Sequence, residues 1–151
     1  MAFKSDVLAK EAFVNKLLSE GFDSAEIKAQ PADIIAQKDG VTWYFEIKLT
    51  DHADKCFGAA TLTEWAQAFK KPDYYRFVVA IRNSEGKFTF RSYTPAEFME
   101  FSTIPPFKVY FNIDFSGAKR SRNSKKSAVA LNEENFRMMN ELFNKMRSEN
   151  Q

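Results

Sequence analysis

Three side chains that could act together on a phosphate group, Asp33, Glu46 and Lys48, fall within one short stretch of the sequence. Two apolar, β-rich runs, residues 32–36 and 41–49, flank an Asp-Gly turn signal and predict a β-hairpin. Since side chains alternate along a strand, Glu46 and Lys48 share one face, and Asp33 on the partner strand is close enough to share a site. Two carboxylates beside a lysine suit a hard divalent cation with a cationic helper.

A simpler interpretation of the same residues is structural. Glu and Lys at i and i+2 on an exposed strand face commonly form ion pairs with cross-strand neighbours. Trp43, Phe45 and Ile47 alternate with them and are expected to point into the core.

The pattern resembles the PD-(D/E)XK nuclease superfamily, to which many restriction endonucleases, Holliday-junction resolvases and recombination exonucleases belong. The tripeptide Glu46-Ile47-Lys48 and the interval of 13 positions from Asp33 to Glu46 suit its motif. Pro31-Ala32-Asp33 departs from it, because the motif has Pro next to Asp. The combination Phe-Glu-Ile-Lys, Leu-Thr-Glu-Trp and Tyr-Arg-Phe-Val-Val-Ala also looks like the restriction-like domains related to the C-terminal region of the NO VEIN protein.

The resemblance implies a magnesium-dependent nuclease that hydrolyses phosphodiester bonds in DNA, with RNA left open as a substrate and Mn²⁺ as a substitute for Mg²⁺. Asp33, Glu46 and the main-chain carbonyl of Ile47 would hold the ion, and Lys48 would orient the attacking water. In-line attack would leave 5′-phosphate and 3′-hydroxyl ends. A homodimer is expected, because many such nucleases cut two strands with two subunits.

Two flanking helices offer further candidates. A helix over residues 5–20 would carry Glu11 in the middle of an apolar stripe, and the resemblance implies an acidic residue from this helix beside the metal. The alternative is that Glu11 lies at the margin of that stripe, which consists of Val7, Val14 and Leu18, and reaches solvent.

The second helix, over residues 61–69, supplies the other candidate. The resemblance implies that Gln67 is directed at the site, and solvent exposure is the competing account. Leu62, Trp65, Ala66 and Phe69 form its expected core stripe. Thr61 and Glu64 have capping-box spacing, so Glu64 is interpreted as a helix-start residue.

The order of the remaining elements agrees with the motif. Strands are expected at residues 74–82, 87–93 and 107–114, with a short helix at 95–101 and a final helix at 132–147. The predicted fold class is α/β: a single restriction-endonuclease-like domain with a mixed central sheet flanked by helices, in an αβββαβ-type core. That core requires one short strand within residues 22–30.

Composition narrows the class of protein. Hydrophobic residues make up 44% of the 151 and charged residues 28%, which is typical of a globular chain and not of a disordered one. No apolar run approaches membrane-spanning length, and the N-terminus lacks a signal-peptide core, which favours the cytoplasm and no membrane partner. One cysteine, Cys56, and one histidine, His52, argue against disulfides, structural zinc and Cys/His nucleophilic catalysis.

Positive charge is concentrated in one segment, residues 117–127, which has no acidic residue. We expect this segment to be a flexible basic tether between a core domain at 1–116 and a C-terminal amphipathic helix within 128–151. Its cations are the expected phosphate contacts, with Lys70, Lys71 and Arg76 as additions. They are Lys119, Arg120, Arg122, Lys125 and Lys126. The alternative is a solvated tail.

Two functions without catalysis compete with the nuclease. One is a nuclease-fold module that binds DNA or protein with its ion site unused. The other is a small mixed α/β accessory protein whose basic tail binds nucleic acid and whose acidic cluster is incidental.

Overall fold

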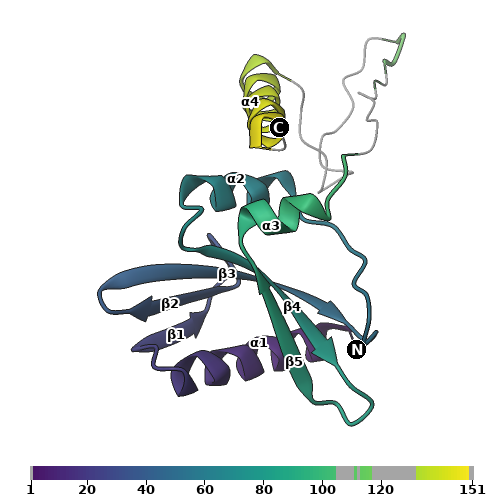
Figure 1. Ribbon diagram of the computed structural model, residues 1–151. Coiled ribbons are helices and arrows are strands. Elements are labelled where there is room, and N and C mark those ends of the chain that lie inside the picture. The colour runs from purple at the N-terminus through teal and green to yellow at the C-terminus, as the bar shows by residue number, and fades with distance from the viewer. Residues whose placement is uncertain (1, 105–110, 112, 117–131, 150–151) are drawn as a thin grey trace.

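A computed structural model describes residues 2–104, 111, 113–116 and 132–149 of the chain. Its core is a five-stranded sheet with helices on both faces (Figure 1). The elements follow in the order α1 (Ala2–Ser19), β1 (Ser24–Ile27), β2 (Ile34–Lys38), β3 (Val41–Thr50), α2 (Leu62–Lys70), β4 (Tyr75–Arg82), β5 (Phe88–Tyr93), α3 (Pro95–Glu100) and α4 (Glu133–Glu149).

The strands lie in the sheet in the order of the chain, β1-β2-β3-β4-β5. All neighbours are antiparallel except β3 and β4, which are parallel and are connected through α2. The predicted α/β class with a mixed sheet flanked by helices is therefore confirmed. The short strand expected within residues 22–30 is β1.

The hairpin of β2 and β3 forms as predicted. Lys38 pairs with Val41, so only Asp39 and Gly40 connect the strands. Both have positive φ, 54° and 78°, which is the backbone of the type I′ turns that Asp-Gly favours because their twist matches that of the strands. The turn thereby sets the register that brings the site residues opposite one another.

Helix α1 covers one face of the sheet, and its buried stripe differs from the predicted one. Ala9, Phe13 and Leu17 are buried, at i, i+4 and i+8. Of the predicted stripe, Val14 packs against this core, whereas Val7 and Leu18 are 36% and 45% exposed. The ring of Phe13 contacts both Phe45 and Phe90. Burial of this large aromatic ring fixes the rotation of the helix, which the smaller residues of the predicted stripe do not.

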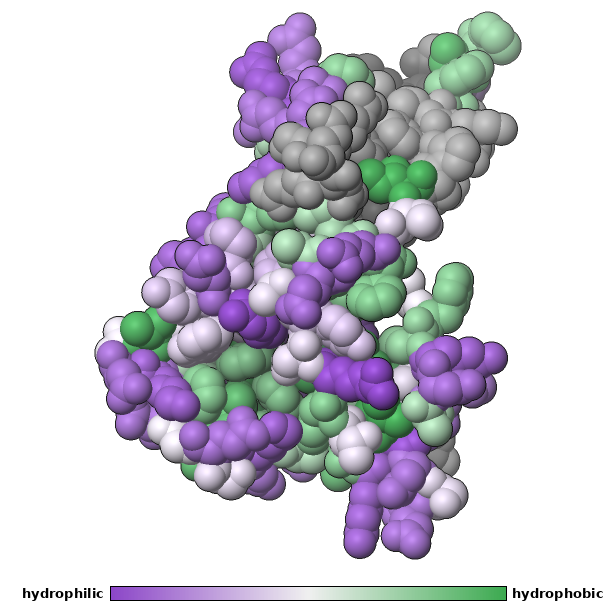
Figure 2. All heavy atoms as spheres, in the orientation of Figure 1, coloured by the Kyte–Doolittle hydropathy of each residue, from purple (hydrophilic) through white to green (hydrophobic). Residues whose placement is uncertain are grey.

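Helices α2 and α3 cover the opposite face. Their core consists of Trp65, Ala68, Phe69, Tyr75, Phe77 and Met99, with Ala32. Trp65 and Phe69 were predicted, but Leu62 is 45% exposed and Ala66 is half-buried, whereas Ala68, three residues after Trp65, is fully buried. Figure 2 shows hydrophilic side chains around the margin of the molecule and hydrophobic atoms over the middle of the sheet.

The C-terminal helix α4 lies against α2 (Figure 1). Lys145 Nζ donates to the Phe69 carbonyl oxygen at 3.1 Å and lies 4.9 Å from the centre of the Phe69 ring. The predicted final helix is thus present. The predicted strand at 107–114 falls largely outside the described residues. Its described positions, 111 and 113–114, are not in a strand. The predicted basic tether at 117–127 falls wholly outside the described residues. Within the described part of the chain, no helix has the length and apolar character needed to cross a bilayer.

Two adjacent leucines test the rotation of α1. Leu17→Ala should lower the free energy of unfolding by about 2–5 kcal/mol, because Leu17 is 3% exposed and its loss leaves a cavity. Leu18→Ala should cost about 0.5 kcal/mol, because that side chain is 45% exposed. Urea denaturation measures both. Equal losses would contradict the observed packing.

Candidate active site

Asp33 is held at the start of β2 by the neighbouring strand. The β2–β3 register, continued one residue beyond Ile34 and Phe45, sets Asp33 opposite Glu46. The Ile47 backbone N–H donates a hydrogen bond of 2.9 Å to Asp33 Oδ2. By the same register Ala32 would face Ile47 in a longer β2, so the Asp33 carboxylate takes the acceptor place of the Ala32 carbonyl and is fixed at the edge of the hairpin.

The same geometry directs a carbonyl to this edge. Along a strand, the N–H and C=O of one residue point to the same side, and successive residues alternate. The Tyr44 N–H donates to the Tyr74 carbonyl oxygen on the β4 side, so Ile47, three residues on, directs both of its groups away from β4 and toward Asp33. This orientation supports the prediction that the Ile47 carbonyl is a ligand.

Glu46 is half-buried, and its surroundings disfavour the negatively charged form of its carboxyl group. Burial, followed by repulsion from Asp33 and Glu64 and a hydrogen bond with Asp33, raises the pKa of Glu46 from its ordinary value of 4.5 to about 8, against the opposing attraction of Lys48. At neutral pH the Glu46 carboxyl group therefore keeps its proton. A divalent cation in its place would remove both the repulsion and the need for that proton.

Lys48 is fixed by a residue of α2. Its Nζ lies 2.8 Å and 3.1 Å from the two carboxylate oxygens of Glu64, and both side chains are only about one-fifth exposed, at 21% and 17%. Glu64 is at the same time the N3 residue of the capping box of α2, where it accepts from the Thr61 N–H and donates its own N–H to the Thr61 hydroxyl. The predicted role of Glu64 as a helix-start residue is confirmed, but its contact with Lys48 was missed.

Lys10, and not Glu11, is the α1 residue that reaches the site. Its Nζ lies 3.2 Å from Asp33 Oδ1 and 2.9 Å from Asp6 Oδ2. Burial alone would lower the pKa of Lys10, but the bonds to Asp6 and Asp33 outweigh it and raise that pKa. Glu11 is exposed, so the prediction that it lies on the buried face of α1 was wrong, and the solvent alternative is correct. The four-residue spacing of Asp6 and Lys10 is the sequence signal that could have indicated an ion pair at Lys10.

The other predicted site residues have mixed outcomes. Gln67 is half-buried on α2, three residues beyond Glu64, and its role stays a prediction. Lys71 Nζ lies 5.7 Å from the ring centre of Tyr44, and the Arg76 guanidinium 5.1 Å from that of Trp43. Lys119, Arg120, Arg122, Lys125 and Lys126 lie outside the described residues.

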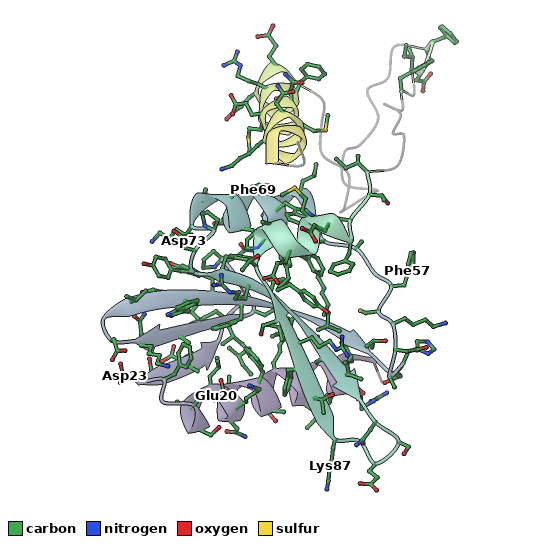
Figure 3. All side chains as sticks on the ribbon, in the orientation of Figure 1. Glu20, Asp23, Phe57, Phe69, Asp73 and Lys87 are labelled. Atoms are coloured by element: carbon green, nitrogen blue, oxygen red, sulfur yellow. The ribbon has the colours of Figure 1, made fainter. Side chains whose placement is uncertain are left out.

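A surface cavity of about 540 Å³ lies between the loop after β3 and the β4–β5 hairpin. Asp51 and Ala53 of the loop line it, together with Arg82, Asn83, Thr89 and Arg91 of the hairpin, among others. Asp51 fixes Arg82 with bonds of 2.8 Å and 3.1 Å, and Ser5 accepts a third bond from the same guanidinium. Further along the same loop, Phe57 is fully exposed and points away from the body of the molecule (Figure 3).

The acidic groups suit a cation that keeps most of its water. Among the residues that the structure describes, no three His, Cys, Asp or Glu side chains are arranged to enclose a metal ion. Asp33 and Glu46 with the Ile47 carbonyl offer only oxygen donors, and few of them. Magnesium commonly binds in this way, through one or two carboxylates and several waters.

Comparison with protein-family models finds no family that matches the chain, and comparison with curated proteins finds no significant match.

The proton on Glu46 predicts how stability depends on pH. Folded Glu46 binds a proton up to about pH 8, whereas an unfolded Glu releases it near 4.5. Without divalent cations, the free energy of unfolding should therefore fall as pH rises from about 5 to 8, by at most about 1.4 kcal/mol per pH unit. Urea denaturation across this range measures it.

Glu46→Gln should remove most of this slope, since the amide does not titrate. Glu100→Gln, at an exposed position of α3, should leave the slope unchanged. A wild-type protein whose stability is constant or rises over this range would contradict the assignment of the proton.

Proposed function

We propose that this protein is a magnesium-dependent nuclease that hydrolyses phosphodiester bonds in DNA. The observation that carries this proposal is the pair of facing carboxyl groups, Asp33 and Glu46, beside a lysine that is fixed on the same strand face. The likeness of these residues to the PD-(D/E)XK motif supports it, as does a mixed sheet whose helices, strands and motif follow one another in the order of that fold.

Asp33, Glu46 and the Ile47 carbonyl would hold the ion. Bound there, magnesium supplies a Lewis acid for the phosphoryl oxygens and lowers the pKa of a coordinated water. The protein's own contribution is to order the Asp33 carboxylate through the Ile47 N–H and Lys10, so that this ligand needs little rearrangement.

Lys48 would act next to these ligands. As it lies two residues from Glu46, it shares the same strand face, and Glu64 restrains its ammonium group. A fixed cation at this position orients the attacking water and offsets the negative charge that accumulates on the phosphorus centre in the transition state. Glu64 would position Lys48 without touching the substrate.

The cavity beside β5 offers a path for the strand that flanks the scissile phosphate. Val79 of β4 pairs with Lys48 on one side and Arg91 on the other, so the three residues form a row on one face of the sheet. With strands about 4.8 Å apart, the backbones of Lys48 and Arg91 are about 10 Å apart. Arg91 lines the cavity and is exposed, and its guanidinium suits a phosphate of the same nucleic-acid strand.

A module that binds nucleic acid without cutting it is the second candidate. Lys10 favours it, because its ammonium already neutralises Asp33 and could stand where a cation would otherwise bind. Metal-dependent cleavage of DNA distinguishes the nuclease from the binding module.

Cleavage of labelled linear, supercoiled and branched DNAs tests the nuclease. We expect cutting that requires Mg²⁺ or Mn²⁺ and that Lys48→Ala lowers by about 100-fold or more, since a positioned cation in the transition state is lost. Lys16→Ala is the matched control, because Lys16 pairs with Glu20 on the exposed side of α1, and it should retain full activity.

Thermal denaturation should show that both variants are folded. Binding of DNA by the wild type without any metal-dependent cutting would instead favour the binding module.

Arg91→Ala should weaken DNA binding about three- to tenfold and reduce the dependence of log K on log salt by about one unit, as the loss of one phosphate contact does. Lys87→Ala, at the tip of the same hairpin (Figure 3), should change neither. Fluorescence anisotropy with a short duplex at several salt concentrations measures both quantities. An Arg91 variant that binds like the wild type would remove the cavity from the path of the substrate.

A further inference from the structure

The hydroxyl of Tyr75 is buried and has no hydrogen-bond partner. The side chain is 1% exposed, and its oxygen is the one buried side-chain polar atom in the described part of the chain for which no partner is found. Its ring packs edge-on against Phe77 in the core under α2. A phenylalanine would fill the same space without the cost of desolvating an unpaired hydroxyl, so the oxygen indicates a partner from outside the polypeptide.

The hydroxyl lies on the acidic side of the sheet. Tyr75 pairs with Tyr44, and Phe77, two residues on, pairs with Glu46, so Tyr75 and Glu46 are diagonal neighbours on one face of two adjacent strands. Burial, followed by the charges of Glu46, Glu64 and Asp33, raises the pKa of Tyr75, which is consistent with its orientation toward these carboxylates. The phenol therefore keeps its proton and is a neutral donor beside the proposed ligands.

We propose that Tyr75 is a positioning residue of the metal site, whose hydroxyl donates a hydrogen bond to an oxygen in the hydration shell of a magnesium ion held by Asp33 and Glu46. This inference rests on the proposed metal site. A hydrated ion supplies what the protein lacks here, an oxygen acceptor of fixed position within the acidic cluster. Tyr75 would thus orient the ion's water from the α2 side, opposite the side from which Lys10 approaches.

Tyr75→Phe separates this role from a purely structural one. In EDTA, the urea midpoint of the variant should equal or exceed that of the wild type, because an unpaired buried hydroxyl is removed. The dissociation constant for magnesium, measured by isothermal titration calorimetry, should rise about five- to tenfold, as loss of one ordinary hydrogen bond implies. Tyr74→Phe is the matched control, since Tyr74 is 40% exposed, and it should change neither value.

The outcomes distinguish failure of this inference from failure of the proposed function. If wild-type protein binds magnesium and Glu46→Gln does not, but Tyr75→Phe binds it as well as the wild type, the hydroxyl does not serve the ion and the inference is overturned alone. A lower urea midpoint in EDTA together with unchanged magnesium affinity also overturns it, because the hydroxyl then has a structural partner. Absence of magnesium binding by the wild type overturns the metal site and the inference with it.

Discussion

The hydrogen bond from the Ile47 N–H to the Asp33 carboxylate is the interaction on which the site depends. A side chain here takes the place of a backbone partner just before β2 begins at Ile34, and the carbonyl of Ile47 points toward the same edge. It also sets Asp33 against Glu46, which then retains a proton to a pH near 8. One bond thus brings two carboxyl groups together, and in the folded chain Glu46 is neutralised by a proton and Asp33 by the ammonium group of Lys10.

The start of α2 serves two purposes that are usually separate. A glutamate at N3 stabilises a helix by completing the capping box, and that need alone would explain Glu64. Here the same carboxylate also bonds to Lys48 on β3. The charge that favours the helix N-terminus therefore fixes the lysine, and the helix cannot shift along the sheet without moving Lys48 relative to Glu46.

Local signals allowed much of this to be predicted from the sequence. The Asp-Gly turn and the alternation along β3 predict the hairpin and the face shared by Glu46 and Lys48, and both are observed. The rotation of α1 could not be predicted, because it depends on which distant rings Phe13 meets, and so Lys10 was missed and Glu11 chosen. The contact of Glu64 with Lys48 was not predicted, because the capping box of α2 already explained a glutamate at this position. The unpaired state of the Tyr75 hydroxyl is a property of packing that no local pattern encodes.

The parallel pairing of β3 with β4 has a consequence for how the chain folds. Every other strand pair is joined by a short connection, whereas Tyr44 and Tyr75 pair across 31 positions of the chain. Closing that loop has the greatest entropic cost of the strand pairings. We therefore expect the two antiparallel units, β1–β3 and β4–β5, to form early and to join late. Asp33 and Glu46 meet in the first unit, while Glu64 and Tyr75 arrive only with the joining step. Before the two units join, the facing carboxyl groups are therefore without Glu64 and Tyr75, and Lys48 lacks the carboxylate that fixes its ammonium group.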